Sequence, residues 1–496
     1  MKIEKIMFIR PGQRYKEILL GPPMGILYLI SVLRHRRPNS YQFELIEQAL
    51  YGLSTEDILK RFRRFDPDLV GFSAVSMEAG EMEEIARLVK KEKPNCITVL
   101  GGPHASIFYD WALKNSDIDY VVIGEGEETF PELLEALEED KPLDKVKGIA
   151  FMREGNLVLT EPRPFIENLD SIPFPAWDMV DFKRYSRVPT MTGWVLSHQW
   201  AFLFTTRACP FKCAYCHNIF GKKVRKRSVE NVLKEIELLV NQYGVKELHI
   251  IDDIFNVDLA RAKQICDEIV NRGIKVKIAF PNGLRADMMD RELIQKLKKA
   301  GCYSTVYSIE TASPRLQKLV HKNLNLEKTK QVIEWTYQEG IITHGSIMLG
   351  FPTETVEEMH LSIRYALEAK LLRCWFFTVV VYPRTELWEI AKKAYPDLNL
   401  DFKHYDWAYL RYSSETPFYK LATGIELRKI WAYAYRRFLF RPKILLKIPF
   451  RYPKNLFHPR QFWEALKMYS TIMPNLKSIF QPGKKFLAQK LIFFSK

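Results

Sequence analysis

The hydrophobic pattern of residues 3–145 alternates short apolar runs with amphipathic segments. Short apolar runs favour buried strands, whereas apolar positions that repeat every three or four residues favour helices. Strands that alternate with helices predict a parallel α/β sheet covered on both faces, a doubly wound Rossmann-like fold that binds ligands at the carboxyl ends of its strands. The predicted strands are Lys5–Ile9, Phe43–Ile46, Leu69–Ser73, Ile97–Leu100 and Tyr120–Ile123, and the predicted helices include Met24–Arg34, Thr55–Arg64, Glu81–Lys90 and Phe130–Leu137.

Residues 146–200 interrupt this alternation. They predict a β-hairpin near Gly148–Thr160, followed by a proline-containing connector between domains. A second alternation begins at residue 201, and its six strand–helix units favour a partial (β/α)6 TIM-type barrel over a second open sheet, although spacing alone does not separate the two. In a barrel, the loops after the strands build the active site. The six predicted strands are Ala201–Thr205, Glu247–Ile251, Lys277–Ala279, Ser304–Ser308, Ile342–Met348 and Phe376–Val381.

The last part of the chain lacks the alternation. Aromatic and basic residues are interleaved there with prolines, which predicts short helices interrupted by proline. We therefore expect a doubly wound domain at 1–145, a connector with the hairpin at 146–200, a partial barrel at 201–400 and a basic, aromatic-rich, mainly helical region at 401–496.

Composition limits the class of protein. The 496 residues are 47% hydrophobic and 27% charged, as expected of a folded globular protein with two or three domains. Seven cysteines, an odd number, and the lack of a signal-like leader argue for the reducing cytoplasm and against a secreted disulfide scaffold. No apolar run is long enough to predict a membrane-spanning helix.

The net charge of +15 is concentrated at one end of the chain. Residues 425–496 contain 16 lysines and arginines but only Glu426 and Glu464, which gives this basic tail a charge of +14. Basic residues beside aromatics suit an anionic membrane surface, to which the protein would bind peripherally, or an acidic and apolar substrate. A helical cap with buried aromatics and solvated charges explains the composition equally well. Nucleic acid is not expected as a partner, because no binding fold for it is recognisable.

Three closely spaced cysteines, Cys209, Cys213 and Cys216, follow the first predicted barrel strand. Thiolates are the usual ligands of iron–sulfur clusters, and this spacing lets one loop hold a single [4Fe-4S] cubane with one iron left open. Zinc is the alternative, with His217 as a fourth ligand, but no second cysteine pair lies nearby. The isolated cysteines are expected to be buried apolar residues; they are Cys96, Cys266, Cys302 and Cys374.

The CxxxCxxC arrangement, with the aromatic Tyr215 before its last cysteine, resembles that of the radical S-adenosylmethionine (SAM) superfamily. The resemblance implies that the open iron binds the amino and carboxylate groups of SAM. It also implies reductive cleavage of SAM to a 5′-deoxyadenosyl radical, and an electron donor such as flavodoxin or ferredoxin.

Other positions resemble the SAM contacts of this superfamily. Asp252 and Asp253, after the second barrel strand, stand where the methionine amino group is bound, and a solvated or helix-capping pair is the alternative. Glu310, at the end of the fourth strand, resembles the residue that holds the ribose hydroxyls. Arg285 resembles a partner of the SAM carboxylate, with a local ion pair to a neighbouring aspartate as an equal alternative.

Two further segments resemble the parts of the barrel that lie near adenine. Gly350 belongs to a glycine-bearing fifth strand, where glycine permits close approach. The segment containing Tyr382 resembles a sixth-strand turn that often reads Pro-x-Pro-Gly-Thr, and the Tyr382 backbone is expected at adenine. Val381 and Arg384 replace the first Pro and the Gly, so the conformation of this turn is open.

A doubly wound domain before such a barrel resembles the cobalamin-binding subgroup of the superfamily. Small and polar residues follow three of its strands, where the nucleotide tail of cobalamin would enter the sheet edge. No Asp-x-His-x-x-Gly motif follows the first strand, so cobalamin is expected base-off, and His104 is expected to pack or hydrogen-bond rather than bind cobalt. A sheet that binds another nucleotide, or nothing, is the alternative. The candidate cobalamin contacts are Ser73, Ser76, Gly101, Gly102, His104, Gly124, Glu125, Gly126 and Glu127.

Together these features predict a cobalamin-dependent radical SAM enzyme that modifies an unactivated carbon of a small molecule, with lipids and other apolar compounds among the candidates. C-methylation through methylcobalamin is the leading reaction. Radical cyclisation or oxidation without methyl transfer is the alternative, because the domain order and the tail also resemble anaerobic porphyrin-ester cyclases and hopanoid-modifying enzymes. A non-catalytic cobalamin or redox sensor is the alternative from another class, and the full set of candidate cofactor contacts argues against it.

Overall fold

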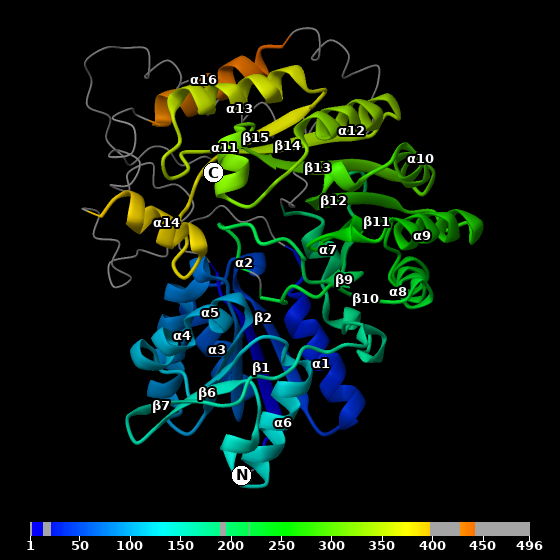
Figure 1. Ribbon diagram of the computed structural model, residues 1–496. Coiled ribbons are helices and arrows are strands. Elements are labelled where there is room, and N and C mark those ends of the chain that lie inside the picture. Colours follow the sequence, from blue (N-terminus) through cyan, green and yellow to red (C-terminus); the bar gives the residue numbers. More distant parts are fainter. Residues whose placement is uncertain (1, 13–20, 189–194, 218, 397–426, 442–496) are drawn as a thin grey trace.

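The computed structural model describes residues 2–12, 21–188, 195–217, 219–396 and 427–441, which are organised around two sheets (Figure 1). Most of the predicted helical region 401–496, and with it most of the basic tail, lies outside the described residues. So does part of the loop after the first strand, over residues 13–20. No helix of the described ranges is long and apolar enough to cross a membrane.

The first sheet has seven strands in the order β2-β1-β3-β4-β5-β6-β7. The strands from β2 to β5 are all parallel, and the strand order reverses beside β1. This confirms the doubly wound prediction, since such a reversal creates the crevice where these sheets bind ligands. The strands are β1 Lys5–Arg10, β2 Gln42–Glu47, β3 Leu69–Ser73, β4 Ile97–Gly101, β5 Tyr120–Val122, β6 Ile149–Arg153 and β7 Asn156–Leu159.

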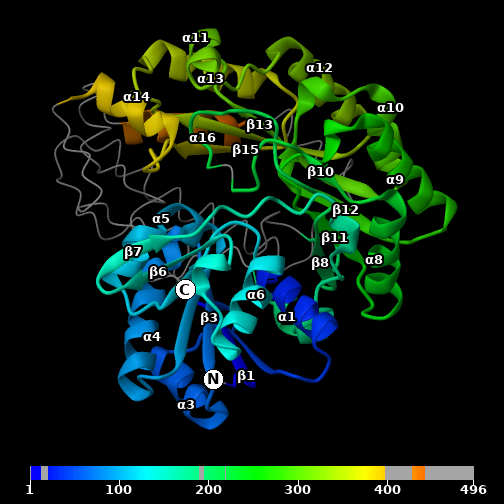
Figure 2. The same ribbon diagram turned by 60° about the horizontal axis from the view of Figure 1, so that its bottom comes forward.

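Helices cover both faces of this sheet, α1 and α6 on one side and α3 to α5 on the other (Figure 2). Along β1, Ile6 and Phe8 pack toward the first layer, and Met7 and Ile9 toward the second. Burial on both faces explains why these strands are continuous apolar runs. The helices are α1 Met24–Arg36, α2 Gln48–Tyr51, α3 Thr55–Phe65, α4 Ala79–Glu92, α5 Gly102–Asn115 and α6 Gly126–Glu138, with short 3-10 turns at Ser76–Glu78 and Leu143–Lys145.

Two parts of this domain differ from the sequence prediction. The hairpin β6–β7 pairs antiparallel with β5, so it extends the first sheet instead of standing in the connector. The small and polar residues that follow β4 do not form an extended loop, because helix α5 begins at Gly102. Its glycines and proline suggested a loop, but Pro103 occupies the first turn, where a missing N–H breaks no helical hydrogen bond. The helix bends at Phe108.

The second sheet has six parallel strands in the order β15-β14-β13-β12-β11-β8. Each strand pairs with the next one along the chain, as in a βα barrel, and within the described residues β8 and β15 do not pair. Curvature into a barrel therefore stays a prediction. The strands are β8 Trp200–Leu203, β11 Glu247–Ile250, β12 Lys277–Leu284, β13 Cys302–Glu310, β14 Ile342–Leu349 and β15 Arg373–Thr378, joined to a two-residue ribbon of β9 Thr206–Arg207 and β10 Arg225–Lys226.

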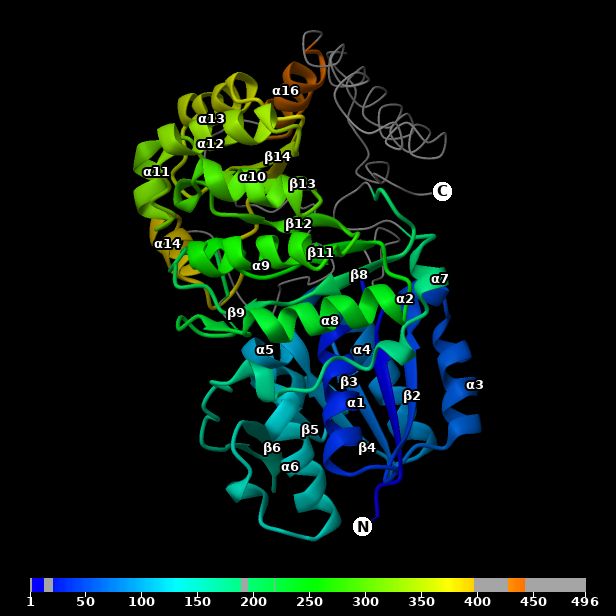
Figure 3. The same cartoon turned by 90° about the vertical axis from the view of Figure 1, so that its right-hand side faces the viewer.

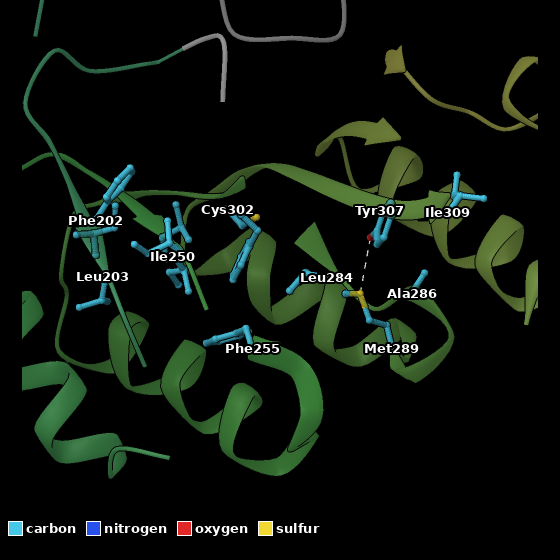
Figure 4. Close-up of a cluster of buried hydrophobic side chains, with 14 of the residues drawn as sticks. Phe202, Leu203, Ile250, Phe255, Leu284, Ala286, Met289, Cys302, Tyr307 and Ile309 are labelled. Carbon is cyan, nitrogen blue, oxygen red and sulfur yellow. Dashed lines mark hydrogen bonds between the residues drawn. The ribbon is translucent and has the colours of Figure 1, made fainter. Parts of the chain in front are cut away.

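The helices of this half line one outer side of the sheet (Figure 3). Between them lies a core in which Leu203 and Ile250 of the strands meet Phe255, and Tyr307 donates to the Met289 sulfur at 3.8 Å (Figure 4). The helices are α8 Val229–Asn241, α9 Leu259–Asn271, α10 Arg291–Lys299, α11 Pro314–Leu319, α12 Leu326–Gln338, α13 Val356–Glu368, α14 Glu386–Ala394 and α16 Leu427–Leu439, with 3-10 turns at Phe255–Val257 and Ala286–Met288. The connector contains 3-10 turns at Leu169–Ser171 and Trp177–Met179, and helix α7 Phe182–Tyr185.

Candidate active site

The predicted cluster cysteines lie in one loop, residues 208–224, which we call the cluster loop. It follows β8, and the ribbon of β9 and β10 closes its base. Ala208, directly before Cys209, has a φ of 80°, and Glu310, at the end of β13, has a φ of 67°. Left-handed backbone is costly for residues other than glycine and gathers at functional sites, so both outliers mark this region.

The three thiols lie close enough to influence one another. Desolvation and then the charges of Asp253 and Cys213 raise the pKa of Cys209. Cys216 is accessible to solvent, yet desolvation by the surrounding loop and then Cys213 raise its pKa to about 11. Thiolates at Cys209 and Cys216 therefore need positive charge nearby at neutral pH, which the irons of a cluster would supply.

The donor set fits a cluster better than a single metal ion. Among the described residues, no group of three or more His, Cys, Asp or Glu side chains converges on one metal position. Cysteines that hold a cubane each bind a different iron and so do not converge, whereas structural zinc needs converging ligands. His217 does not join the thiols, because its Nε2 lies 2.9 Å from the Pro383 carbonyl oxygen. The zinc alternative is therefore disfavoured.

Several predicted SAM contacts come together beside this loop. The Tyr215 ring lies 6.1 Å from the Phe351 ring, next to Gly350, and the charge of Glu310 is among the groups that raise the Tyr215 pKa, after burial. Glu310 itself is buried, 3.4 Å from the Ser346 hydroxyl and 3.7 Å from the Lys322 ammonium. Lys322 is a cation that sequence reasoning missed, because nothing in its local sequence sets it apart from surface lysines.

The aspartate pair divides into two roles. Asp252 is buried and accepts hydrogen bonds from the Thr205 amide at 2.6 Å and from the Thr205 hydroxyl, so it fixes the end of β8. Asp253 accepts from the Ala208 amide and lies beside the cysteines, where desolvation and the charge of Asp252 raise its pKa. The ammonium group of a ligand would stabilise the ionised Asp253 carboxylate. It would not reach Asp252, which is enclosed by the protein.

Arg285 is committed to a local ion pair, the second of the two alternatives from the sequence. Its Nε lies 2.9 Å from Asp287, its guanidinium donates to the Lys322 and Asn323 carbonyls, and it covers the Phe211 ring at 3.7 Å. These contacts use the guanidinium to brace the cluster loop.

The two segments that were predicted to lie near adenine have left-handed backbone, the conformation that glycine favours. Gly350 has a φ of 92°, and its amide donates to Glu354 at 2.6 Å. The Tyr382 carbonyl accepts from the Thr385 hydroxyl at 2.6 Å, which closes the turn. Arg384, in the place of the relatives' glycine, has a φ of 63°, so the turn is left-handed despite the substitution.

The first group of candidate cobalamin contacts lies at the ends of β3 and β4. Gly102 has a φ of 91°, and a Cβ there would come within 3.1 Å of the Ala74 carbonyl and the Ser73 hydroxyl. Ser76 lies 3.1 Å from Nδ1 of the fully buried His104, and burial lowers the His104 pKa to about 4. The neutral His104 thus has the hydrogen-bonding role expected of it.

The second group lies after β5, the strand that pairs with β4. Ser106, which the candidate list omitted, donates to the Gly102 carbonyl at 3.1 Å and accepts from the Gly124 amide at 3.0 Å, so it ties the two loops together. Gly124 has a φ of 77° and faces open space, which leaves room for a ligand at this edge, while Gly126 packs near Leu29.

Glu125 and Glu127 are not available to a ligand as the sequence suggested. Both are buried in ion pairs with the ribbon that closes the cluster loop. Glu125 pairs with Arg207 at 2.9 Å and with Arg225 at 2.7 Å, and Glu127 pairs with Arg207 at 2.5 Å. The candidate cobalamin edge and the cluster loop therefore face each other across this network.

Comparison with known proteins agrees with both halves of the structure. Residues 19–134 match the B12 binding domain family, and residues 203–366 match the Radical SAM superfamily. The chain is 31% identical to an uncharacterized methyltransferase of Pyrococcus horikoshii, over 90% of this chain and 95% of that one. It is also 28% identical to the anaerobic magnesium-protoporphyrin IX monomethyl ester cyclase of Cereibacter sphaeroides, over 90% of this chain and 72% of that one.

Among solved structures, the radical SAM methyltransferase TsrM from Kitasatospora setae, with cobalamin and a [4Fe-4S] cluster bound, superposes with a TM-score of 0.65 at 19% identity, over 79% of this chain and 75% of that one. Fold, site and sequence matches together define a radical SAM enzyme with a B12-binding domain. The chain belongs to the cobalamin-binding radical SAM family, whose cofactors are a [4Fe-4S] cluster, SAM and cobalamin.

Proposed function

We propose that this enzyme methylates an unactivated carbon of a small molecule. One observation carries the proposal: the cluster loop lies directly against the carboxyl edge of the first sheet. His217, next to Cys216, meets the Phe108 ring of α5 edge-on at 6.2 Å, and Arg207 pairs with Glu125. This arrangement favours two cofactors facing one cavity, which radical initiation alone would not require.

When bound, the cluster supplies the electron that cleaves SAM, and cobalamin supplies the methyl group. In this proposal Cys209, Cys213 and Cys216 hold the cluster. Asp253 binds the SAM ammonium, because its side chain reaches solvent while desolvation and then the charge of Asp252 raise its pKa. Glu310 accepts from the ribose hydroxyls, with Lys322 balancing its charge. Tyr215, Gly350 and Tyr382 border the adenine.

Cobalamin would occupy the edge formed by the loops after β3, β4 and β5. Ser73, Ser76 and the backbone of Gly101, Gly102 and Gly124 supply small polar contacts there, and Gly126 keeps the neighbouring helix close. No histidine ligand to cobalt is expected from the first-strand loop, so the base-off state remains part of the proposal. The domain limits at 1–145, 146–200, 201–400 and 401–496 also remain proposals.

The reaction can be tested without knowing the substrate. Anaerobically reconstituted protein is reduced in the presence of SAM, and 5′-deoxyadenosine and S-adenosylhomocysteine are both measured. We expect both products, because one SAM is used for the radical and one for the methyl group. With cell extract as the source of substrate, a product heavier by one CH2 group supports methyl transfer, and 5′-deoxyadenosine without S-adenosylhomocysteine contradicts it.

Radical cyclisation or oxidation is the second candidate, favoured by the likeness to the porphyrin-ester cyclase over nearly the whole chain. It predicts 5′-deoxyadenosine, no S-adenosylhomocysteine and a product that gains no carbon. The same experiment therefore separates the two reactions.

The proposed partners are a small-molecule substrate, with an apolar compound favoured, and a flavodoxin or ferredoxin as electron donor. Anionic membrane binding is proposed for the basic tail. On its described part, α16, Lys429, Arg436 and Arg437 are exposed and Ile430, Ala434 and Phe438 are buried. Such a charged outer face suits acidic headgroups.

A further inference from the structure

The base of the cluster loop brings two arginines face to face. In the antiparallel ribbon, Arg207 of β9 is the direct partner of Arg225 of β10. Like charges at opposed positions destabilise a pair of strands. The ribbon has only two residues in each strand, so its own hydrogen bonds are too few to offset the repulsion between the two arginines. An anion therefore has to lie between them.

Glu125, from the loop after β5 of the first sheet, provides that anion. Arg207 Nη1 donates to Glu125 Oε1 at 2.9 Å, and Arg225 Nη1 lies 2.7 Å from both Glu125 oxygens. All three side chains are buried: Arg207 is 8% exposed, Glu125 3% and Arg225 2%. Glu127 adds a second carboxylate on Arg207. A single glutamate of the first domain thus forms ion pairs with both strands at the base of the cluster loop.

Further hydrogen bonds of Glu125 and Arg225 connect this ion-pair network to the connector and to the cluster loop. Glu125 Oε2 accepts from the Ile166 amide of the connector at 2.8 Å. Arg225 donates to the Ile166 carbonyl at 2.9 Å and to the Phe220 carbonyl, inside the cluster loop, at 3.1 Å. The network therefore joins first domain, connector and cluster loop.

We propose that Glu125 is a positioning residue that fixes the cluster loop against the cobalamin edge. The inference rests on the proposed function, because a fixed separation between loop and edge matters only if both hold cofactors. Buried ion pairs add little stability compared with apolar packing, so geometric specificity is the physical reason to retain one here. Glu125 acts through the loop and need not touch either cofactor.

A matched control lies directly after the ribbon, which ends at Lys226. Arg227 pairs with Glu235 of α8, at 5% and 0% exposure, and Glu235 also accepts from the Trp177 indole at 3.0 Å. This ion pair is as buried as the Glu125 pairs, but both partners follow the ribbon and neither comes from the first sheet. Glu125→Gln and Glu235→Gln therefore remove equal charge from equally enclosed sites.

The test measures backbone hydrogen–deuterium exchange of residues 208–224 in the full chain, before any cofactor is added. We expect Glu125→Gln to speed exchange of this segment about 10-fold or more over the wild type, and Glu235→Gln to leave it near the wild-type rate. Arg225→Lys keeps the positive charge but loses the planar guanidinium with its several N–H donors. It should therefore give an intermediate exchange rate. This readout does not depend on catalysis, so it stands even if the proposed reaction is wrong.

A second readout uses the loaded protein. Glu125→Gln should still bind cluster and cobalamin, with an altered magnetic coupling between the reduced cluster and cob(II)alamin in electron paramagnetic resonance. Equal exchange in Glu125→Gln and Glu235→Gln, or an unchanged coupling, would overturn the proposal. So would general unfolding of both Glu125→Gln and Arg225→Lys, because the network would then support the fold as a whole.

Discussion

Arg384, in the turn after β15, lies 2.8 Å from Asp110 of α5, and so joins the last strand of the second sheet to a helix of the first domain. The same guanidinium lies 5.3 Å from the Phe108 ring, where α5 bends. Arg384 has left-handed backbone, so a residue that costs backbone energy also makes one of the contacts between the two domains.

The Arg384 site predicts an unusual order of stabilities. Arg384→Gly loses a half-exposed ion pair of about 0–1 kcal/mol but gains about 1 kcal/mol from relieved backbone strain, so its stability should stay near that of the wild type. Arg384→Ala loses the ion pair and keeps the strain, so it should be less stable than Arg384→Gly. Urea unfolding of the cofactor-free protein measures both. An Arg384→Gly protein weaker than Arg384→Ala would contradict the account.

The cluster assignment predicts that the protein loses its iron when any one of three cysteines is replaced, and keeps it when a fourth cysteine is replaced. Cys209→Ala, Cys213→Ala and Cys216→Ala each remove one of three ligands, so iron and sulfide content and the visible absorbance should fall sharply. Cys266→Ala is the control, since Cys266 is buried among apolar residues. Iron retained at the wild-type level in the Cys213→Ala protein would show that the assignment is wrong.

The Glu310 site predicts weaker SAM binding without loss of the cluster. A charged acceptor is worth about 1.5–3 kcal/mol per hydrogen bond, so Glu310→Gln should bind SAM about 10- to 100-fold more weakly. Titration of the reconstituted protein, followed by a perturbed cluster spectrum, gives the affinity. Glu327→Gln, on the first turn of α12, is a control on the protein surface. Unchanged affinity in Glu310→Gln would place the ribose elsewhere.

Glu354 predicts a stability that falls with rising pH. Burial raises the Glu354 pKa to about 8, and among the described residues its Oε1 has no hydrogen-bond partner. Because the folded pKa lies above the unfolded one of 4.5, the native state holds the proton more tightly, and stability is lost as the pH rises from about 5 to 8. Glu354→Gln should remove this dependence and be more stable than wild type at pH 8, by about 1–3 kcal/mol.

Glu358, four residues further along the chain, is the opposite control for that experiment. Although desolvation opposes it, hydrogen bonding to Arg315 and Ser313 lowers the Glu358 pKa to about 2. Its contribution is therefore present at neutral pH and is lost as the pH falls through about 4 to 2. Urea unfolding at pH 6 and pH 8 should separate Glu354→Gln from wild type and leave Glu358→Gln parallel to it. Parallel curves for all three proteins would refute the prediction.

The charged face of α16 predicts salt-sensitive binding to acidic vesicles. The double variant Arg436→Glu, Arg437→Glu should reduce cosedimentation with phosphatidylserine vesicles, because each basic residue near such a surface contributes about 1 kcal/mol. Charge reversal at Lys60 and Lys91, exposed on α3 and α4, keeps the net charge comparable and serves as control. If cosedimentation falls equally in both variants, or in neither, the basic residues of α16 do not form a membrane-binding face.

The sequence determined the two sheets and the cluster loop because their signals are local. Continuous apolar runs mark strands buried on both faces, and three closely spaced thiols in one loop favour an iron–sulfur cluster. Most strand limits it predicted lie close to those observed. β15 spans Arg373–Thr378 where Phe376–Val381 was predicted, and β12 continues through Asn282 and Gly283 to Leu284. There, pairing with β13 outweighs residues that read locally as a turn.

Only the tertiary structure decided what the charged residues do, because a charge finds its partner across the fold and not along the chain. Glu125 and Glu127 had the sequence context of ligand-binding residues, and the structure pairs them with Arg207 and Arg225, 80 or more positions away. The structure likewise separated Asp252 from Asp253, which are adjacent in sequence, by enclosing one carboxylate and leaving the other accessible. Burial sets the energy of a charge, and burial is a property of the assembled domains.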